Sequence, residues 1–259
     1  MTYRCSRCGN ERDEFGILCP WCGAWMSGRS LREARAPGPL PVPLPDVRAC
    51  SRARLKTRSG AIDRLVAGGF VPGTSVLLAG PPGAGKSTLI LQILDSSGAA
   101  SLYASGEESI EQLKLRADRL HISSRLISVL FETNVTLVEM HVKKALPRVL
   151  VIDSIQTAFT DLSDSLPGTA AQVRRCTGIL RRLAQEKGFV LLLVGQVTKG
   201  LKAAGPKMLE HAVDCVLALS FCEGEPGLRT LSVVKNRFGP AGNSLPLPFT
   251  GGGFFLGKR

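Results

Sequence analysis

The stretch GPPGAGKS, residues 80–87, decides the fold of this chain. It follows the apolar run SVLLA (75–79) and opens the helical pattern STLILQIL (87–94). The pattern G-x-x-x-x-G-K-[ST] requires this order of strand, loop and helix, because the loop amides then wrap phosphate oxygens at a helix N-terminus. A chance glycine-rich turn is the alternative, and the correct flanks count against it. The sequence therefore predicts a site for ATP or GTP.

Individual residues of this phosphate loop have expected tasks. Lys86 reaches the terminal phosphates, and the Ser87 hydroxyl ligates Mg²⁺. Asp153 ends the apolar pattern RVLVIDS (148–154), a position from which a carboxylate can hold the same ion. Such an Asp can also cap the next turn, but its pairing with a phosphate loop favours the ligand role. The candidate nucleotide-binding residues are Gly80, Pro81, Pro82, Gly83, Ala84, Gly85, Lys86, Ser87 and Thr88.

Hydrolysis also needs a group that orients or deprotonates water. SGEES (105–109) places Glu107 and Glu108 just past an expected strand, at the edge of the sheet where the phosphate loop lies. The alternative is a negatively charged first turn of the following helix, which the helix dipole favours. We expect Glu107 to be the catalytic base, and Glu108 remains an alternative.

Apolar runs and helical patterns alternate along the body of the chain. Strands are expected at 75–80, 100–105, 148–154 and 189–195, and helices at 87–94, 109–120, 136–146 and 168–187. This order predicts an α/β fold with a central, mostly parallel sheet. Two later apolar stretches, 212–220 and 228–236, predict an antiparallel hairpin that closes the sheet.

The N-terminal region carries two Cys-x-x-Cys pairs separated by ten residues. Two pairs at this spacing predict a closed, structural zinc site, because each pair covers one face of a tetrahedral ion. Two disulfides or free thiols are the alternative. The expected ligands are Cys5, Cys8, Cys19 and Cys22, and the cysteines at 50, 176, 215 and 222 are expected to fill the core.

Composition divides the chain and suggests a partner. We expect a zinc knuckle at residues 1–28, a proline-rich linker at 29–54 that includes APGPLPVPLP, and an α/β domain at 55–259. The net charge is +12, and residues 1–60 hold 11 Lys or Arg against 5 Asp or Glu. This asymmetry is typical of a solvated basic surface or of an arm that lies along nucleic acid.

The chain carries no apolar run long enough to cross a membrane, and no signal peptide separates Met1 from the cysteines. We therefore expect an intracellular, cytoplasmic protein without a membrane partner.

A second unusual stretch is VVKNRFG, residues 233–239. Lys235 and Arg237 are two apart, so on a strand their side chains point to the same face and present two cations together. We expect an anion beside them. The alternative is that they protect an edge strand from aggregation.

Together these motifs resemble the RadA/Sms family of bacterial recombination ATPases, which belong to the RecA-like group of phosphate-loop proteins. The resemblance runs from Cys5 to about Gly239. The matching stretches are CSRCG, CPWCGAW, LAGPPGAGKSTLILQ, YASGEES, LKLRADRL, VIDSIQT, VTKG, AGPKMLEHAVDCVL and KNRFG, the last being specific to the family. The resemblance implies a zinc knuckle joined to a RecA-like ATPase domain at 55–259. It also implies a hexameric ring on single-stranded and branched DNA that drives branch migration in recombination and repair, beside recombinase and replication proteins.

The resemblance also implies roles for individual residues. Lys235 and Arg237 would complete the nucleotide site of a neighbouring subunit as cations supplied in trans, or would contact DNA directly. Gln196 stands where the family usually has His, and would act as a polar γ-phosphate sensor. The family usually has a further C-terminal domain that resembles the Lon protease, and the present chain stops at Arg259.

DNA is expected at two loops, 161–172 and 198–207. The second loop supplies Lys199, Lys202 and Lys207, and phosphate contacts by such lysines make binding salt-dependent and weakly sequence-specific. The expected function is a DNA-dependent ATPase motor that uses ATP, Mg²⁺ and Zn²⁺. The alternatives are a nucleotide-gated DNA-binding adaptor with little motor activity, and a signalling ATPase of the circadian-clock type with a protein partner.

Overall fold

The computed structural model describes residues 3–5, 7–12, 18–24, 42–47, 53–162, 165–196 and 206–257. The chain divides into two compact units, Met1–Ser51 and Arg52–Arg259, which are considered separately here. Much of the expected linker, Cys50 and the candidate residues Lys199 and Lys202 lie outside the described residues. The boundaries expected at residues 28 and 54 therefore stay a prediction.

The small unit contains two short strands, β1 (Tyr3–Arg4) and β2 (Glu11–Arg12), which pair in antiparallel register. The tight turn between them contains the first Cys-x-x-Cys pair. A 3₁₀ helix, η1 (Leu44–Asp46), begins after Pro43 at a point where proline is tolerated, because the first helical amides have no partner.

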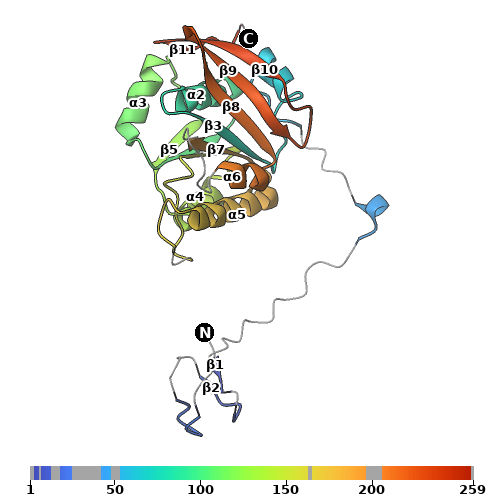
Figure 1. The fold of residues 1–259 in the computed structure, drawn as a ribbon, viewed down its shortest axis with the longest axis vertical. Helices are drawn as coiled ribbons and strands as arrows, with labels where there is room; N and C mark the ends of the chain where they lie inside the picture. The colour runs from blue at the N-terminus through green and yellow to red at the C-terminus, as the bar shows by residue number, and fades with distance from the viewer. Residues whose placement is uncertain are drawn as a thin grey trace. The chain divides into compact units, whose positions relative to one another are not determined.

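The large unit is built on a sheet of nine strands in the order β11-β10-β9-β8-β3-β7-β6-β4-β5 (Figure 1). The strands from β8 to β5 in this order are parallel, and β8, β9, β10 and β11 pair in antiparallel fashion. The central, mostly parallel sheet expected from the sequence is confirmed. The strands are β3 (Ser75–Gly80), β4 (Ser101–Ser105), β5 (Ile127–Phe131), β6 (Val149–Asp153), β7 (Val190–Gln196), β8 (Cys215–Cys222), β9 (Glu225–Asn236), β10 (Ser244–Thr250) and β11 (Gly253–Phe254).

Helices cover both faces of this sheet. In Figure 1, α4, α5 and α6 lie along its lower side, and α2 and α3 lie at its upper side. The described helices are α1 (Gly60–Leu65), α2 (Lys86–Ser97), α3 (Ile110–Arg119), α4 (Val135–Ala145), α5 (Ala170–Lys187) and α6 (Pro206–Ala212). None of them is long and apolar enough to cross a membrane.

The strand β3 is the centre of the core, because both of its faces are covered. Val76 and Leu78 belong to the hydrophobic cluster that includes α2, whereas Leu77 and Ala79 belong to the cluster that includes α4 and α5. Side chains alternate between the faces of a strand, so a continuous apolar run is what a doubly covered strand requires. The phosphate loop therefore follows a strand that is buried on both faces.

Local capping fixes where the helices begin. Ser109 forms a capping box with Gln112 at the start of α3, because each side chain accepts a hydrogen bond from the backbone of the other residue. At the start of α5 the Thr169 side chain accepts a hydrogen bond from the amide of Gln172 without the reciprocal bond, and Gly188 ends this helix in the left-handed conformation. These caps explain why the observed helices begin within about two residues of the patterns read from the sequence.

Candidate functional site

The phosphate loop runs from the carboxyl end of β3 to the first residue of α2, as its flanking patterns predict. Two of its glycines, Gly83 and Gly85, have positive φ angles of 75° and 98°, which favour glycine. A Cβ atom at Gly85 would also lie 2.9 Å from ring carbons of Phe254. Glycine at 85 is therefore required both by the turn and by the aromatic side chain behind it.

Lys86 folds back over the loop that carries it. Its Nζ donates hydrogen bonds to the carbonyl oxygens of Gly80, at 2.9 Å, and of Pro81, at 3.0 Å. Burial lowers the pKa of Lys86, and the negative charges of Asp153 and Glu107 oppose this effect. The Lys86 ammonium is thus already desolvated. A phosphate group beside it would stabilise its positive charge.

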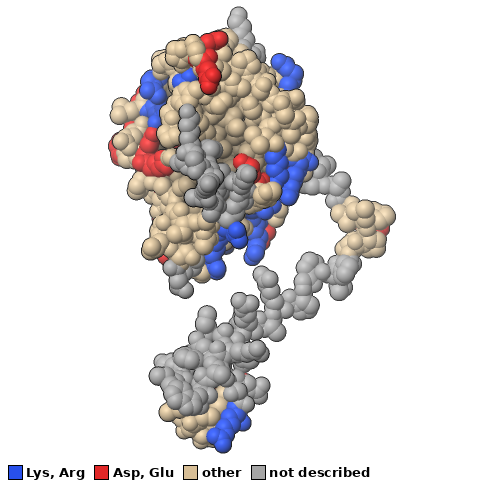
Figure 2. Space-filling view, viewed as in Figure 1, with Lys and Arg blue, Asp and Glu red and all other residues tan. Residues whose placement is uncertain are grey.

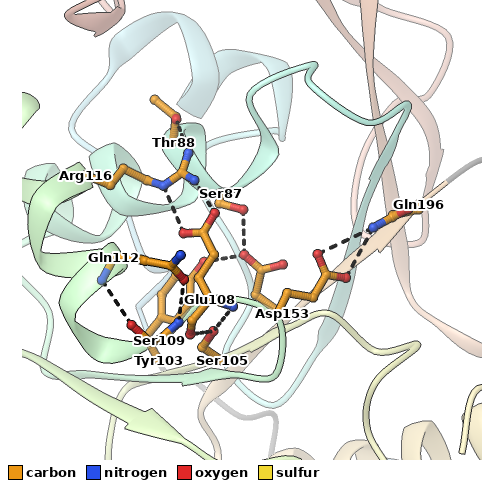
Figure 3. A network of polar contacts seen from close by, with 11 residues as sticks. Ser87, Thr88, Tyr103, Ser105, Glu108, Ser109, Gln112, Arg116, Asp153 and Gln196 are labelled. Atoms are coloured by element: carbon orange, nitrogen blue, oxygen red, sulfur yellow. Dashed lines mark hydrogen bonds and ion pairs between the residues drawn. The ribbon is translucent and has the colours of Figure 1, made fainter.

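Ser87 and Asp153 come together as the sequence predicts for a magnesium site (Figure 3). Ser87 Oγ donates to Asp153 Oδ2 at 2.6 Å, and the hydroxyl of Tyr103 donates to the same oxygen. A carboxylate beside a hydroxyl is a set of oxygen donors that suits Mg²⁺. Burial raises the pKa of Asp153, and the hydrogen bonds from Ser87 and Tyr103 oppose this increase.

The structure separates the two candidate glutamates. Ser154 Oγ donates to Glu107 Oε1 at 2.6 Å, and Gln196 Nε2 donates to the same atom at 3.2 Å. Glu107 is thereby held between the ends of β6 and β7. Glu108 instead forms an ion pair with Arg116, whose charge already balances its carboxylate. The geometry therefore favours Glu107 as the base, and its role stays a prediction.

These groups line one open cavity of about 280 Å³ at the carboxyl edge of the sheet. The phosphate loop lines this cavity together with Glu107, Asp153, Gln196, Arg116 and Phe249. Arg116 also donates to Thr88 Oγ1 at 3.1 Å, so α3 is tied to the start of α2. The cavity joins a phosphate loop, two oxygens that could hold Mg²⁺ and a carboxylate that can accept a proton.

The four N-terminal cysteines form a cluster whose Sγ atoms all lie within 4.8 Å of one another. Two Sγ pairs, Cys5 with Cys22 and Cys8 with Cys19, are 3.7 and 3.6 Å apart. A tetrahedral zinc ion with Zn–S bonds of about 2.3 Å requires sulfur atoms about 3.8 Å apart, so the spacing fits this ion.

The backbone around the cysteines repeats the same turn twice. The amide of Gly9 donates to the carbonyl of Cys5, and that of Gly23 donates to the carbonyl of Cys19, at 2.9 and 2.8 Å. Backbone hydrogen bonds from Cys8 and Arg7 lower the pKa of Cys5 to about 6, which favours the thiolate that binds metal. The cluster could hold zinc, and its donors are of the chemistry that zinc requires.

Lys235 and Arg237 lie at the other edge of the sheet. Lys235 is opposite Val216, near the start of β8, whereas the phosphate loop follows the far end of the neighbouring strand β3. Val216 in turn pairs with Leu77, three residues before the end of β3, and neither cation is among the residues that line the cavity of its own chain. The anion beside them is Asp214, which accepts from Arg237, and Lys235 donates to the neutral backbone carbonyls of Glu210 and Val213.

The candidate DNA loops are described only in part. Residues 163, 164 and 197–205 lie outside the described residues, and of Lys207 only the backbone, in α6, is described. The structure adds four polar residues that the sequence patterns did not identify: Tyr103, Arg116, Ser154 and Asp214. No local spacing marks them, because each acts through a partner that is distant in the sequence.

The fold and the loop define a phosphate-loop nucleotide-binding protein of the RecA-like class. A solved structure with this fold is the crystal structure of the RadB recombinase, with a TM-score of 0.61 and 24% identity, over 77% of this chain and 98% of that one. Residues 41–201 match the sequence profile of the AAA domain family. The chain belongs to this family, and its relatives include the bacterial DNA repair proteins RadA.

Three of these relatives are 40% identical to the chain. DNA repair protein RadA of Bacillus subtilis (strain 168) matches over 253 residues, 91% of this chain and 55% of that protein. RadA of Pseudomonas aeruginosa covers 92% and 55% of the two chains, and RadA of Chlamydia muridarum covers 95% and 56%. The chain thus spans about half the length of the curated relatives it matches, and the resemblance read from its motifs is confirmed.

A first prediction concerns the cysteine cluster. Purified protein is expected to contain one equivalent of zinc per chain by elemental analysis, and Cys8→Ser to lose most of it, because three thiolates no longer close the tetrahedron. Cys222→Ser, which changes a cysteine of the large unit, is the control and keeps the metal. Equal zinc in the two variants would contradict the assignment.

A second prediction concerns Asp153. Since burial raises its pKa, the native state binds this proton more tightly than the unfolded state, and stability falls as pH rises from the unfolded pKa to the folded one. Without nucleotide or Mg²⁺, Asp153→Asn should therefore have a higher melting temperature than the unchanged protein at pH 8. The difference should shrink toward pH 4 in thermal unfolding. A variant that is less stable at pH 8 would refute this account.

Proposed function

We propose that the chain is an ATPase that acts on DNA in recombination and repair. The observation that carries this proposal is the convergence of Lys86, Ser87, Asp153 and Glu107 on one cavity at the carboxyl edge of the sheet. The proposal also draws on the relatives, whose printed name is DNA repair protein RadA. Because the chain spans only about 55% of those proteins, their activity as a whole is carried over here as part of the proposal.

In this mechanism the loop residues bind and orient the nucleotide. Backbone amides of the phosphate loop hold the phosphate oxygens, and Lys86 leaves the carbonyls of Gly80 and Pro81 to contact the terminal phosphates. Ser87 and Asp153 would hold Mg²⁺, which neutralises charge on the phosphates when bound. Burial of these groups strengthens each electrostatic contact.

Glu107 orients and deprotonates the attacking water. Its carboxylate is fixed by Ser154 and Gln196, which limits the positions that the base can take. Gln196 ends β7 and leads directly into residues 197–205, where Lys199 and Lys202 are expected to contact DNA. A change at the γ-phosphate that moves Gln196 would therefore be passed to that DNA loop.

Charge supports DNA as the partner. Figure 2 shows Lys and Arg gathered on the lower part of the large unit, and the net charge of the chain is +12. Four exposed cations lie on α5, which follows the first candidate DNA loop: Arg174, Arg175, Arg182 and Lys187. A basic helix that follows the first candidate loop in the sequence and contacts α6 suits a phosphate backbone, with binding that weakens as salt increases.

The proposed ATPase has three further features. A zinc knuckle at 1–28 and a linker at 29–54 precede a RecA-like ATPase domain at 55–259. Copies of this domain form a hexameric ring on single-stranded or branched DNA and drive branch migration. Lys235 and Arg237 are the candidates for completing the nucleotide site of a neighbouring copy, and neither lines the cavity of its own chain.

A third prediction tests the cavity. Lys86→Ala should reduce ATP hydrolysis by about 10² or more, because a phosphate-stabilising charge is lost. Glu107→Gln should reduce turnover by a comparable factor and still bind nucleotide, because only the base is removed. The matched control is Glu108→Gln, which changes the neighbouring carboxylate that faces Arg116 and keeps most of the turnover.

The result that would contradict this assignment is full hydrolysis by Lys86→Ala in a steady-state phosphate-release assay. Hydrolysis by Glu107→Gln that equals the unchanged protein, combined with its loss in Glu108→Gln, would transfer the role of base to Glu108.

A fourth prediction separates the motor from the nucleotide-gated adaptor. Single-stranded DNA should stimulate ATP hydrolysis, with less stimulation at higher salt, and the protein should extend strand exchange on a three-stranded DNA intermediate when ATP is present. Lys86→Ala is the matched control and should bind DNA without extension. DNA binding without extension by the unchanged protein would favour the adaptor.

A further inference from the structure

Asp214 is a buried carboxylate outside the nucleotide cavity. It lies just before β8, at the amino edge of the sheet, and only 5% of it is exposed. One of its oxygens, Oδ2, accepts hydrogen bonds from the backbone amide and the hydroxyl of Ser75, at 3.0 and 2.7 Å. Ser75 is the first residue of β3, the strand that leads into the phosphate loop. The Oδ2 atom of Asp214 is therefore held in place by β3.

The other oxygen of Asp214 faces two guanidinium groups. Arg237 Nη1 lies 3.0 Å from Oδ1, and Arg181 Nη2, from α5, lies 3.6 Å from the same atom. The Arg237 side chain is 53% exposed, although its partner is buried. A guanidinium has five N–H donors in a rigid fork, so Arg237 can hold Asp214 on one side and present other donors outward.

Lys235 has a different environment from Arg237. Its Nζ donates to the carbonyl oxygens of Glu210 and Val213, each at 2.7 Å, and of His211 at 3.4 Å. An ammonium has three N–H donors, and three carbonyls at the end of α6 use them. Lys235 therefore holds α6 within its own chain, whereas Arg237 keeps donors for another anion.

The cluster carries more positive than negative charge. The charged groups that act on Lys235 are the cations Arg237 and Arg181 and the carboxylates Asp214 and Glu210. Three cations, Lys235 included, thus face two carboxylates. In agreement with this excess, burial and then the charge of Arg237 lower the pKa of Lys235. One positive charge of the cluster is thus not balanced by its described carboxylates, and the side chain of Arg237 is more exposed than that of Arg181.

We propose that Asp214 is a positioning residue that orients Arg237 toward the polyphosphate bound in the cavity of a second copy of this chain. The proposal rests on the proposed function and assigns the two cations different tasks. Arg237 contacts the phosphate from the neighbouring copy, and Lys235 holds α6, the helix after the second candidate DNA loop. Because Asp214 is anchored to Ser75, the direction of Arg237 is set by the same strand that carries the phosphate loop.

The other explanation for Asp214 is purely structural, as a staple between β3 and β8. The two explanations predict different coupling between substitutions at Asp214 and at Arg237. If Asp214 acts through Arg237, its loss matters only while Arg237 is present; if it only stabilises the sheet, its loss has the same effect with or without Arg237. A double-mutant cycle measures this difference.

The experiment compares steady-state ATP hydrolysis by the full chain and by Asp214→Asn, Arg237→Ala and the double variant. Asp214→Asn should lower kcat about tenfold or more and leave KM within about twofold, because an ionic hydrogen bond that orients Arg237 is lost. The same change on the Arg237→Ala background should have no further effect. Equal losses on both backgrounds, or an unchanged kcat for Asp214→Asn, would overturn the proposal.

Two further variants keep this test decisive. Asp63→Asn is the matched control, because Asp63 accepts two hydrogen bonds from Thr57 and faces no cation of this cluster; it should lower stability without changing kcat. If Asp214→Asn does not fold, the cycle is repeated with Asp214→Glu, which keeps the charge and displaces it by one methylene. Additive losses in that cycle count equally against the proposal.

Hydrolysis by mixed subunits tests separately whether a cation is supplied by a neighbouring copy. Mixing Lys86→Ala subunits with Arg237→Ala subunits should restore part of the hydrolysis, because some interfaces then combine an intact phosphate loop with an intact Arg237. If Arg237→Ala alone keeps full turnover, the supply of cations in trans is wrong. If it loses turnover and the cycle is additive, only the role of Asp214 is wrong.

Discussion

The parallel register of the central strands is the constraint on which the rest of this structure depends. Gly80 of β3 lies opposite Gln196 of β7, and Ser105 of β4 lies opposite Asp153 of β6. Because parallel strands end at the same edge, this register gathers a loop, a carboxylate and an amide that are spread over more than a hundred residues of the sequence. Burial of β3 on both faces maintains the register, since a slip of one residue would exchange its two sets of apolar side chains.

The same strand also organises the opposite edge. β3 begins at Ser75, which binds Asp214, and ends at the phosphate loop. One edge of the sheet thus carries the groups that bind a nucleotide, and the other carries cations that reach outward. In the proposed ring of identical copies, each copy would then bind a nucleotide on one side and donate charge on the other. Neighbouring copies in such a ring would contact each other through two different surfaces, and the ring closes when the rotation between copies adds up to a full turn.

The parts of the fold that were predictable from sequence are those with local signals. The phosphate loop, the strands at its sides and the cysteine pairs follow from short spacings, and the covering helices follow from apolar periodicity with caps at Ser109 and Thr169. By contrast, Tyr103 lies in a continuous apolar run, and nothing there indicates that its hydroxyl meets Asp153 across the sheet. The pairing of Arg116 with Glu108 spans a turn and most of a helix. The first contact is decided by the pairing of strands and the second by the path of the turn before α3, and neither has a fixed spacing in the sequence.

The last strand of the sheet, β11, contacts both the phosphate loop and the helix that follows this loop. The ring of Phe254 in β11 lies against Gly85, and Gln92 of α2 exchanges two hydrogen bonds with the backbone of Phe254, at 2.8 and 2.9 Å. A displacement at residue 254 is therefore transmitted to the loop across a single layer of contacts. The shape of the phosphate loop thus depends on the packing of β11 as well as on the strand and helix that flank the loop in the sequence.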